Sequence, residues 1–175
     1  MPVMDRFTGV LFEALDAPRL DPRARSWLAA NAVVHSALFG LVGADDEIPA
    51  YRLSHDSRPV DLVLKSHWRE SITAVIAEQP GLILDLRSEG YVALGPLPDR
   101  DDAYGIRVVT ASSDGVKRAL NHFNKKGKGE FVRALAQAGL DHADIGSLIA
   151  WAAGMGIRLE ASDRVSGRRM VDLVV

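Results

Sequence analysis

The run GLILDL, residues 81–86, restricts the fold most, because a short apolar stretch between turn residues favours a buried strand. Two further segments, GIRVVT (105–110) and VKRALNHF (116–123), are also predicted strands. The chain closes with IRLEAS (157–162), a turn at DRVSG and RRMVDLVV (168–175), which together indicate a hairpin. We expect the strand at 81–86 and the closing strand to lie in one sheet.

Helical segments separate these runs. Residues 20–42 predict one helix, with Asp21 as its N-cap and Pro22 as its first residue. Further helices are predicted at 65–78, 126–138 and 143–153, and the segment RFTGVLFEAL (6–15) is predicted to be extended. Because strands and helices mix without strict alternation, the sequence predicts a mixed α/β (α+β) fold. We expect residues 1–175 to form a single domain, with a central sheet flanked by helices.

Composition excludes several classes of protein. The 175 residues include no cysteine, which excludes disulfides, thiolate metal sites and cysteine redox chemistry. The first 16 residues lack the apolar core of a signal peptide, and no apolar run is long enough to span a membrane. These features predict a cytoplasmic protein with no membrane partner.

Positive charge is concentrated in one part of a chain whose formal net charge is −2. Residues 116–133 carry six cationic side chains and one acidic one, Glu130, and the cations are Lys117, Arg118, Lys125, Lys126, Lys128 and Arg133. A helix that starts near Lys126 would present its first N–H groups beside these lysines, which is a generic anion site. Gly127 and Gly129 would let the backbone approach a ligand closely.

Phosphate is the anion that this combination suits best, and Phe123 could stack a base of single-stranded or distorted nucleic acid. The alternative interpretation is equally simple. Lysines at a helix start are commonly solvated surface, and Phe123 could belong to the core.

A second group of polar residues follows the predicted strand at 81–86, namely Asp85, Arg87, Ser88 and Tyr91. Ligand sites in mixed sheets commonly lie beyond strand ends. Arg52, between Tyr51 and Leu53, could reach the same ligand with its guanidinium. Structural alternatives are an ion pair between Arg52 and Asp85, and Ser88 acting as the N-cap of a short helix. Trp68 is expected in the core.

The motifs of several large enzyme classes are missing. The sequence contains no G-x-S-x-G, P-loop, H-E-x-x-H or G-x-G-x-x-G, and its five histidines form no i, i+4 pair. We therefore expect no bound metal and no cofactor, and the sequence assigns no catalytic residue.

Several segments in this order resemble the YaaA family, which is tied to the bacterial response to peroxide. They are SALFGLVGADDEIPAYRL (36–53), HWRESI (67–72), LILDLRSEGY (82–91) and HFNKKGKG (122–129). The resemblance implies a cytoplasmic oxidative-stress protein with a mixed α and β fold, a basic cleft and a helix-hairpin-helix element. It also implies DNA binding and lower free iron.

Two departures from the family are expected. The chain begins almost at the counterpart of RFTGVLF, so we expect it to lack the family's N-terminal segment. Loss of that segment would expose an apolar patch at Phe7, Val10 and Phe12, which predicts self-association or a companion chain. The segment 135–156 has two helical stretches but lacks the tight glycine loop of a helix-hairpin-helix.

Three functions from different classes are considered, and no sequence feature favours the third, a purely structural adaptor. The first is a stress protein that binds DNA or another phosphate-bearing ligand in a cleft, with Lys125, Lys126 and Lys128 on one edge. Arg52 and the turn from Ser88 to Tyr91 would form the other edge. The second is an enzyme acting on a nucleobase, nucleotide or other phosphorylated small molecule, with Lys126 and Arg52 holding the phosphate. Ser88, Asp85 or Tyr91 would then supply the chemistry.

Overall fold

The fold is mixed α/β, as the sequence predicts, in a computed structural model that describes residues 1–111, 117–119 and 123–175. Its main sheet has the strand order β3 (Ile83–Asp85), β4 (Ala103–Ala111), β7 (Arg168–Val174) and β6 (Arg158–Val165), and β5 (Lys117–Ala119) also pairs with β4. Strands β3, β4 and β7 are parallel, and β6 and β7 form an antiparallel hairpin. The predicted terminal hairpin, and the shared sheet of residues 83–85 and 168–174, are therefore confirmed.

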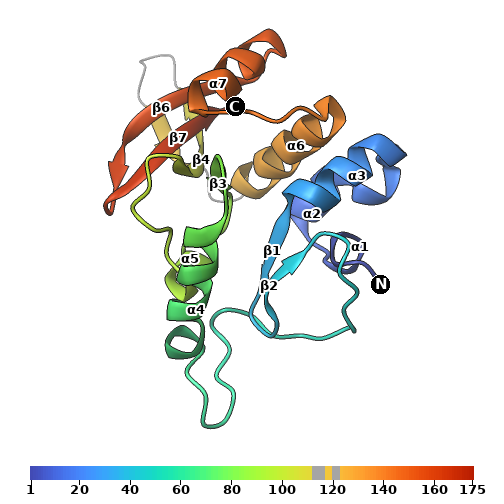
Figure 1. Cartoon of the computed structure of the whole chain (residues 1–175), viewed down its shortest axis with the longest axis vertical. Helices are drawn as coiled ribbons and strands as arrows, with labels where there is room; N and C mark the ends of the chain where they lie inside the picture. Colours follow the sequence, from blue (N-terminus) through green and yellow to red (C-terminus); the bar gives the residue numbers. More distant parts are fainter. Residues whose placement is uncertain (112–116, 120–122) are drawn as a thin grey trace.

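One face of this sheet packs against two helices, α6 (Phe123–Ala138) and α7 (Ile145–Gly154) (Figure 1). Alternate residues of β4 and β7 face them, because side chains point to opposite sides along a strand. The resulting core joins five strand residues to four helix residues: Ile106, Val108, Leu159, Val171, Leu173, Phe131, Leu135, Leu148 and Ala152. The intervening positions carry an ion pair, with Arg107 Nη2 2.8 Å from Oδ1 of Asp172.

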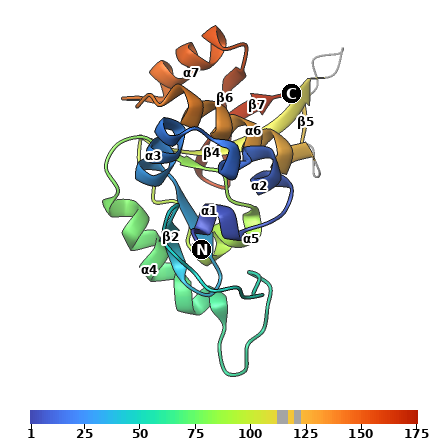
Figure 2. The ribbon, with the colours of Figure 1, turned by 90° about the vertical axis from the view of Figure 1, so that its right-hand side faces the viewer.

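The N-terminal part of the chain packs on the other side of α6 (Figures 1 and 2). It consists of α1 (Val3–Arg6), α2 (Val10–Leu15), a short 3₁₀ helix η1 (Ala17–Arg19), α3 (Pro22–Asn31) and the hairpin of β1 (Val33–Ser36) and β2 (Gly40–Gly43). A second core, which includes Leu15, Leu28 and Ala136 of α6, holds this part in place. Helix α6 is thus shared by both cores.

A third layer consists of α4 (Leu64–Glu78) and α5 (Glu89–Leu94). Leu64 and Leu94 pack with Ala37, and Trp68 lies against this group. The indole nitrogen of Trp68 donates a 2.9 Å hydrogen bond to the carbonyl oxygen of Ala37. Trp68 therefore packs against the core as expected, but it is half-buried and not fully enclosed.

The predicted start of the helix at Asp21 is confirmed, because the Asp21 side chain accepts a 2.8 Å hydrogen bond from the backbone N–H of Ala24. Its predicted end at residue 42 is wrong. The helix stops at Asn31, and residues 33–43 form the β1–β2 hairpin. The β-branched pair Val33 and Val34 favours a strand over a helix at this point.

Two more predictions need correction. Residues 10–15 of the segment predicted to be extended are helical, and Gly9 (φ 114°) precedes the helix in a conformation that favours glycine. In the predicted strand at 116–123, residues 117–119 are strand and Phe123 already begins α6, three residues before the predicted start at Lys126. The remaining positions of that segment lie outside the described residues.

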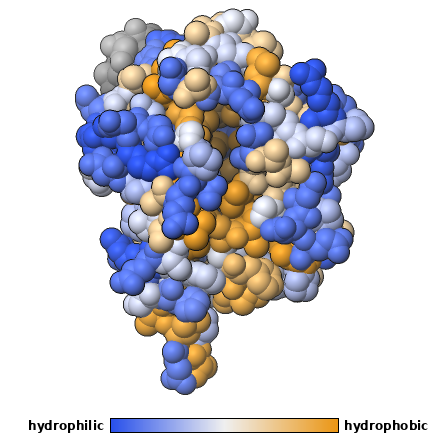
Figure 3. All heavy atoms as spheres, in the orientation of Figure 1, coloured by the Kyte–Doolittle hydropathy of each residue, from blue (hydrophilic) through white to orange (hydrophobic). Residues whose placement is uncertain are grey.

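Apolar residues are unevenly exposed on the face of the molecule drawn in Figure 3. They gather around a hollow near the middle and again at the lower tip. Val60 is 89% exposed and Val63 67%, in the loop before α4. Phe7, Val10 and Phe12, the expected N-terminal patch, are each half-buried, and the rings of Phe7 and Phe12 stack with centroids 5.3 Å apart. Self-association through that patch stays a prediction.

Among the residues that the structure describes, no helix combines the length and apolar character that crossing a membrane requires.

Candidate functional site

A buried ion pair occupies the carboxyl end of β3. Asp85, the last residue of the strand, accepts hydrogen bonds from both ends of the Arg87 guanidinium, at 2.8 Å from Nε and 2.7 Å from Nη2. It also accepts the backbone N–H of Arg87 at 3.0 Å. The two side chains are only 4% and 14% exposed. This two-point geometry fixes the arginine plane and leaves its remaining nitrogen to a third residue.

That third residue is His35 of β1. Nη1 of Arg87 lies 3.0 Å from Nδ1 of His35. Since a guanidinium only donates hydrogen bonds, Nδ1 accepts, and the neutral imidazole carries its proton on Nε2. Nε2 is buried and has no hydrogen-bond partner among the described residues. The contact joins the N-terminal hairpin to the main sheet through polar atoms.

Lys128 reaches the same place from α6. Its residue is 6% exposed, and its Nζ donates a 3.0 Å hydrogen bond to the carbonyl oxygen of Leu86. The neighbouring Gly129 lets α6 lie directly against α2. A Cβ on Gly129 would lie 2.2 Å from the carbonyl oxygen of Leu11 in α2, so only glycine fits there. We call His35, Asp85, Arg87 and Lys128 the buried charged cluster.

Burial and neighbouring charges shift the pKa values within the cluster. Burial, assisted by the charge of Arg87, lowers the pKa of His35 to about 4, although Asp85 opposes this. Burial raises the pKa of Asp85, but hydrogen bonds and charge from Arg87, together with the charge of Lys128, leave it below its ordinary value. Burial also lowers the pKa of Lys128 against the attraction of Asp85 and Glu89. Shifted pKa values of this kind are typical of functional sites, although structural ion pairs share them.

Aromatic and hydroxyl groups border the cluster. The ring of Tyr91 meets His35 edge-on at 5.3 Å and His55 at 5.2 Å between ring centroids. Burial raises the pKa of Tyr91, and Tyr51 and Asp56 add to this, so its hydroxyl keeps its proton. The hydroxyl groups of Ser36 and Tyr51 lie 2.6 Å apart. A hydrogen-bonded hydroxyl pair thus lies next to His35, with Ser36 on β1 and Tyr51 in the loop after β2.

The structure separates the three predicted lysines. Lys125 and Lys126 are exposed in the first turn of α6, and Lys126 Nζ lies 3.5 Å from the carboxylate of Glu130. Lys128 instead points inward to Leu86, two residues further along the helix. Phe123 is the first residue of α6, and its side chain lies outside the described part of the structure.

The residues predicted for the opposite edge are also divided. Tyr91 is half-buried beside the cluster, whereas Arg52 and Ser88 are exposed. Within the described residues nothing hydrogen-bonds the Arg52 guanidinium, and Asp85 pairs with Arg87 in its place. Ser88 occupies the N-cap position of α5, but its side chain makes no capping hydrogen bond.

Sequence reasoning missed His35, because it lay inside the segment predicted as a helix. The available signal was the polar pair His35–Ser36 directly after the β-branched Val33–Val34, which is typical of a strand end. Arg87 was noticed only as a neighbour of Asp85, and its spacing of two residues beyond a strand end gave no indication of a bidentate pair.

Fold and site together define a mixed α/β protein that gathers charged side chains beyond the carboxyl end of a parallel strand. A family model described as "Peroxide stress protein YaaA" matches residues 1–153. The chain belongs to the YaaA family.

Similar chains occur in several bacteria under the name UPF0246 protein. One from Corynebacterium efficiens is 38% identical over 168 residues, covering 93% of this chain and 66% of that protein. One from Corynebacterium glutamicum is 40% identical over 141 residues (78% and 55%), and one from Streptomyces coelicolor 34% over 171 residues (96% and 65%). The chain thus spans between 55% and 66% of the length of these relatives.

Proposed function

We propose that this protein acts in the response to peroxide by binding the phosphates of DNA, or of another phosphate-bearing ligand, through the exposed start of α6, and so limits peroxide and iron damage. The description of the matching family model supports the part concerning peroxide. The position of Lys125 and Lys126 supports the part concerning phosphate.

The observation that carries the proposal is the pair of exposed lysines in the first turn of a 16-residue helix. The positive end of the helix dipole and two ammonium groups favour an anion at the same place. The helix is also firmly held, because Gly129 packs directly on α2 and Lys128 is tied to Leu86. Binding a ligand there would therefore cost little conformational entropy.

The existing partner of Lys126 would not prevent this. Lys126 and Glu130 are 60% and 57% exposed, and exposed ion pairs contribute about 0–1 kcal/mol. A phosphate can replace such a carboxylate at little cost. Arg52, exposed and without a hydrogen-bond partner among the described residues, is proposed as the second contact, with two parallel hydrogen bonds to one phosphate.

The test is a titration of fluorescent single-stranded and double-stranded DNA at several salt concentrations. A phosphate-binding protein loses affinity steeply as salt rises, because bound counterions are released. Arg52→Lys should weaken binding although the charge is kept, since lysine lacks the planar fork. Absence of DNA binding at low salt, or equal binding by Arg52→Lys, would reject the respective part of the proposal.

A second candidate function is an enzyme acting on a nucleotide or other phosphorylated small molecule. Two groups of the buried charged cluster favour it. His35 has a neutral imidazole with a pKa of about 4, and burial lowers the pKa of the Lys128 amine. An uncharged base and an amine of reduced pKa are groups that proton transfer can use. Saturable binding of a nucleotide with weak salt dependence, together with its turnover, would favour this candidate over the first.

A further inference from the structure

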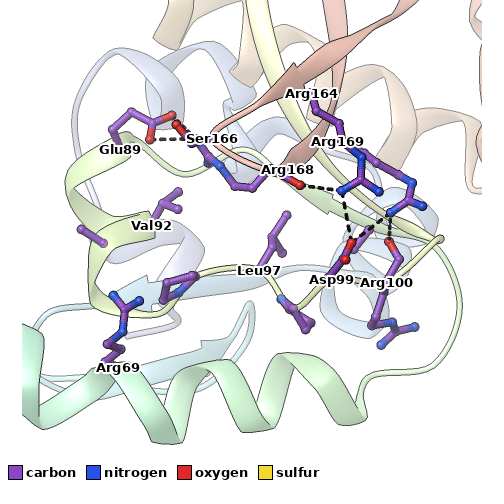
Figure 4. Close-up of a pocket in the computed structure, with 15 residues that line it drawn as sticks. Arg69, Glu89, Val92, Leu97, Asp99, Arg100, Arg164, Ser166, Arg168 and Arg169 are labelled. Carbon is purple, nitrogen blue, oxygen red and sulfur yellow. Dashed lines mark hydrogen bonds and ion pairs between the residues drawn. The ribbon is translucent and has the colours of Figure 1, made fainter.

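A cavity of about 570 Å³ opens between α4, α5, the loop after α5 and the turn of the β6–β7 hairpin (Figure 4). Its walls combine two kinds of side chain. Val92, Ala93, Pro96, Leu97 and Pro98 are apolar, whereas five arginines and two carboxylates line the rest: Arg69, Arg100, Arg164, Arg168, Arg169, Glu89 and Asp99.

Two of the arginines are structural. Arg100 binds Asp102 at 2.7 Å and donates to carbonyl oxygens at the end of α4, including that of Ala77 at 3.0 Å. Arg169 donates to the carbonyl oxygen of Arg100 at 3.0 Å and pairs with Asp101. These contacts fix the wall of the cavity that the loop forms.

The other three arginines are held less firmly, and Arg164 also donates a 2.7 Å hydrogen bond to the carbonyl oxygen of Gly167 in its own turn. Arg168 is 13% exposed and uses a single nitrogen, Nη2, for both oxygens of Glu89, at 2.7 and 2.8 Å, while Glu89 itself is 78% exposed. Arg164 meets Asp99, which is 79% exposed, at 3.3 Å. The guanidinium of Arg69, on α4, makes no hydrogen bond or ion pair with the residues that the structure describes.

This asymmetry suits an incoming anion. An ion pair with an exposed carboxylate contributes about 0–1 kcal/mol, so displacing Glu89 from Arg168 costs little. The Arg168 guanidinium that is left is largely shielded from water, where a bidentate phosphate contact is strongest. The apolar wall from Val92 to Pro98 can then receive the uncharged body of the same ligand.

We propose that this cavity binds a small phosphate monoester with an apolar or aromatic body, such as a nucleoside monophosphate, with its phosphate on Arg168 and its body extending along the apolar wall toward Arg69 (Figure 4). The volume lies within the range of about 300–1,000 Å³ that is usual for small-molecule sites. A nucleic-acid strand fits poorly, because Asp99, which lines the cavity, is 79% exposed and places negative charge at its opening. The site is separate from Lys125 and Lys126 and goes beyond the proposed DNA contact.

Calorimetric titrations with adenosine monophosphate, inorganic phosphate and adenosine test the proposal. Adenosine monophosphate should bind more tightly than either fragment, since only it uses both walls. Arg168→Ala should weaken its binding about tenfold or more, which is the usual worth of a charged hydrogen-bonded contact. Glu89→Gln should tighten it several-fold by removing the competing carboxylate. The matched control is Arg158→Ala, an exposed β6 arginine paired with Glu160, which should change nothing.

Arg69→Ala guards against a folding defect in Arg168→Ala, because the exposed Arg69 holds no other described residue. It should weaken the nucleotide and leave the thermal midpoint unchanged. Equal binding by the wild type, Arg168→Ala and Arg69→Ala would overturn the proposal, as would equal weakening by Arg158→Ala. Loss of DNA affinity in Arg168→Ala, together with no binding of adenosine monophosphate to the wild type, would overturn the assignment to a small molecule.

Discussion

Nδ1 of His35 lies 3.0 Å from Nη1 of Arg87, although the two residues are 52 positions apart in the chain. The contact attaches the β1–β2 hairpin to the end of β3, where Arg87 is already held by Asp85. It requires a neutral imidazole, because a protonated Nδ1 would direct a proton at a guanidinium.

Acid should therefore weaken the fold through His35. The folded protein binds this proton only near pH 4, whereas an unfolded histidine binds it near pH 6.5. Between these values the unfolded chain holds more protons, so the free energy of unfolding falls as the pH drops from 6.5 to 4, by about 3 kcal/mol in total. His35→Asn keeps an acceptor for Arg87 but cannot titrate, and should flatten this part of the curve. Denaturant unfolding at pH 7, 6 and 5 measures the effect, and the exposed His67→Asn should leave the wild-type slope.

Asp85→Asn should be strongly destabilising, because it leaves the buried guanidinium of Arg87 without its counter-charge. Breaking a buried pair in this way typically costs about 3–5 kcal/mol. Asp102→Asn is the matched control, since Asp102 and Arg100 also lie two positions apart and form the same two-point contact with a more exposed carboxylate. Chemical denaturation should show a much smaller loss for Asp102→Asn. Similar losses in both variants would mean that burial of the Asp85 pair is energetically unimportant.

The two glycines of α6 should respond to alanine in opposite directions. At Gly129 a Cβ would lie 2.2 Å from the Leu11 carbonyl oxygen and 2.8 Å from Ala14, and overpacking of this kind costs about 1–3 kcal/mol. At Gly127 the nearest atom would be Val108 Cγ1 at 3.4 Å, an ordinary contact, and alanine gains about 1 kcal/mol in helix propensity. Thermal unfolding should rank Gly127→Ala at or above wild type and Gly129→Ala below it. The reverse order would contradict the packing of α6 on α2.

The pKa of Lys128 should move in opposite directions when Glu89 and when Arg168, two of its charged neighbours, is neutralised. Glu89 raises this pKa and Arg168 lowers it. Glu89→Gln should therefore lower the pKa further, and Arg168→Gln should raise it. NMR titration of the lysine side chain measures both shifts, with Glu130→Gln as a control that should leave the pKa of Lys128 unchanged, because Glu130 pairs with Lys126 instead. Shifts of the same sign in both variants would exclude the electrostatic link between the cavity and the cluster.

The sheet and the long helices could be predicted because their signals are local. The run at 81–86, the closing hairpin and the Asp21 cap each depend on a few neighbouring residues. The β1–β2 hairpin was predicted wrongly because its residues continue a helical spacing of apolar side chains from α3. The β-branched pair Val33 and Val34 favours a strand, but this local signal is weaker than the spacing.

The site was less predictable than the fold for the same reason. Asp85 and Tyr91 could be selected by their position after a strand, but the residue that completes the cluster, His35, comes from a hairpin far away in sequence. The three lysines could not be told apart by charge. Their separation depends on how α6 packs, which buries Lys128 against the carbonyl oxygen of Leu86 while Lys125 and Lys126 stay exposed.

The most direct test of phosphate binding at α6 is the salt dependence of DNA affinity in a matched pair of lysine variants. Lys126→Ala removes an exposed lysine from the first turn of α6, and Lys65→Ala removes one from the first turn of α4. Fluorescence anisotropy at several salt concentrations should give Lys126→Ala a weaker affinity and a log–log slope reduced by about 1, because one phosphate contact is lost. Lys65→Ala should match the wild type. Equal slopes and affinities for all three proteins would show that Lys126 is ordinary solvated surface.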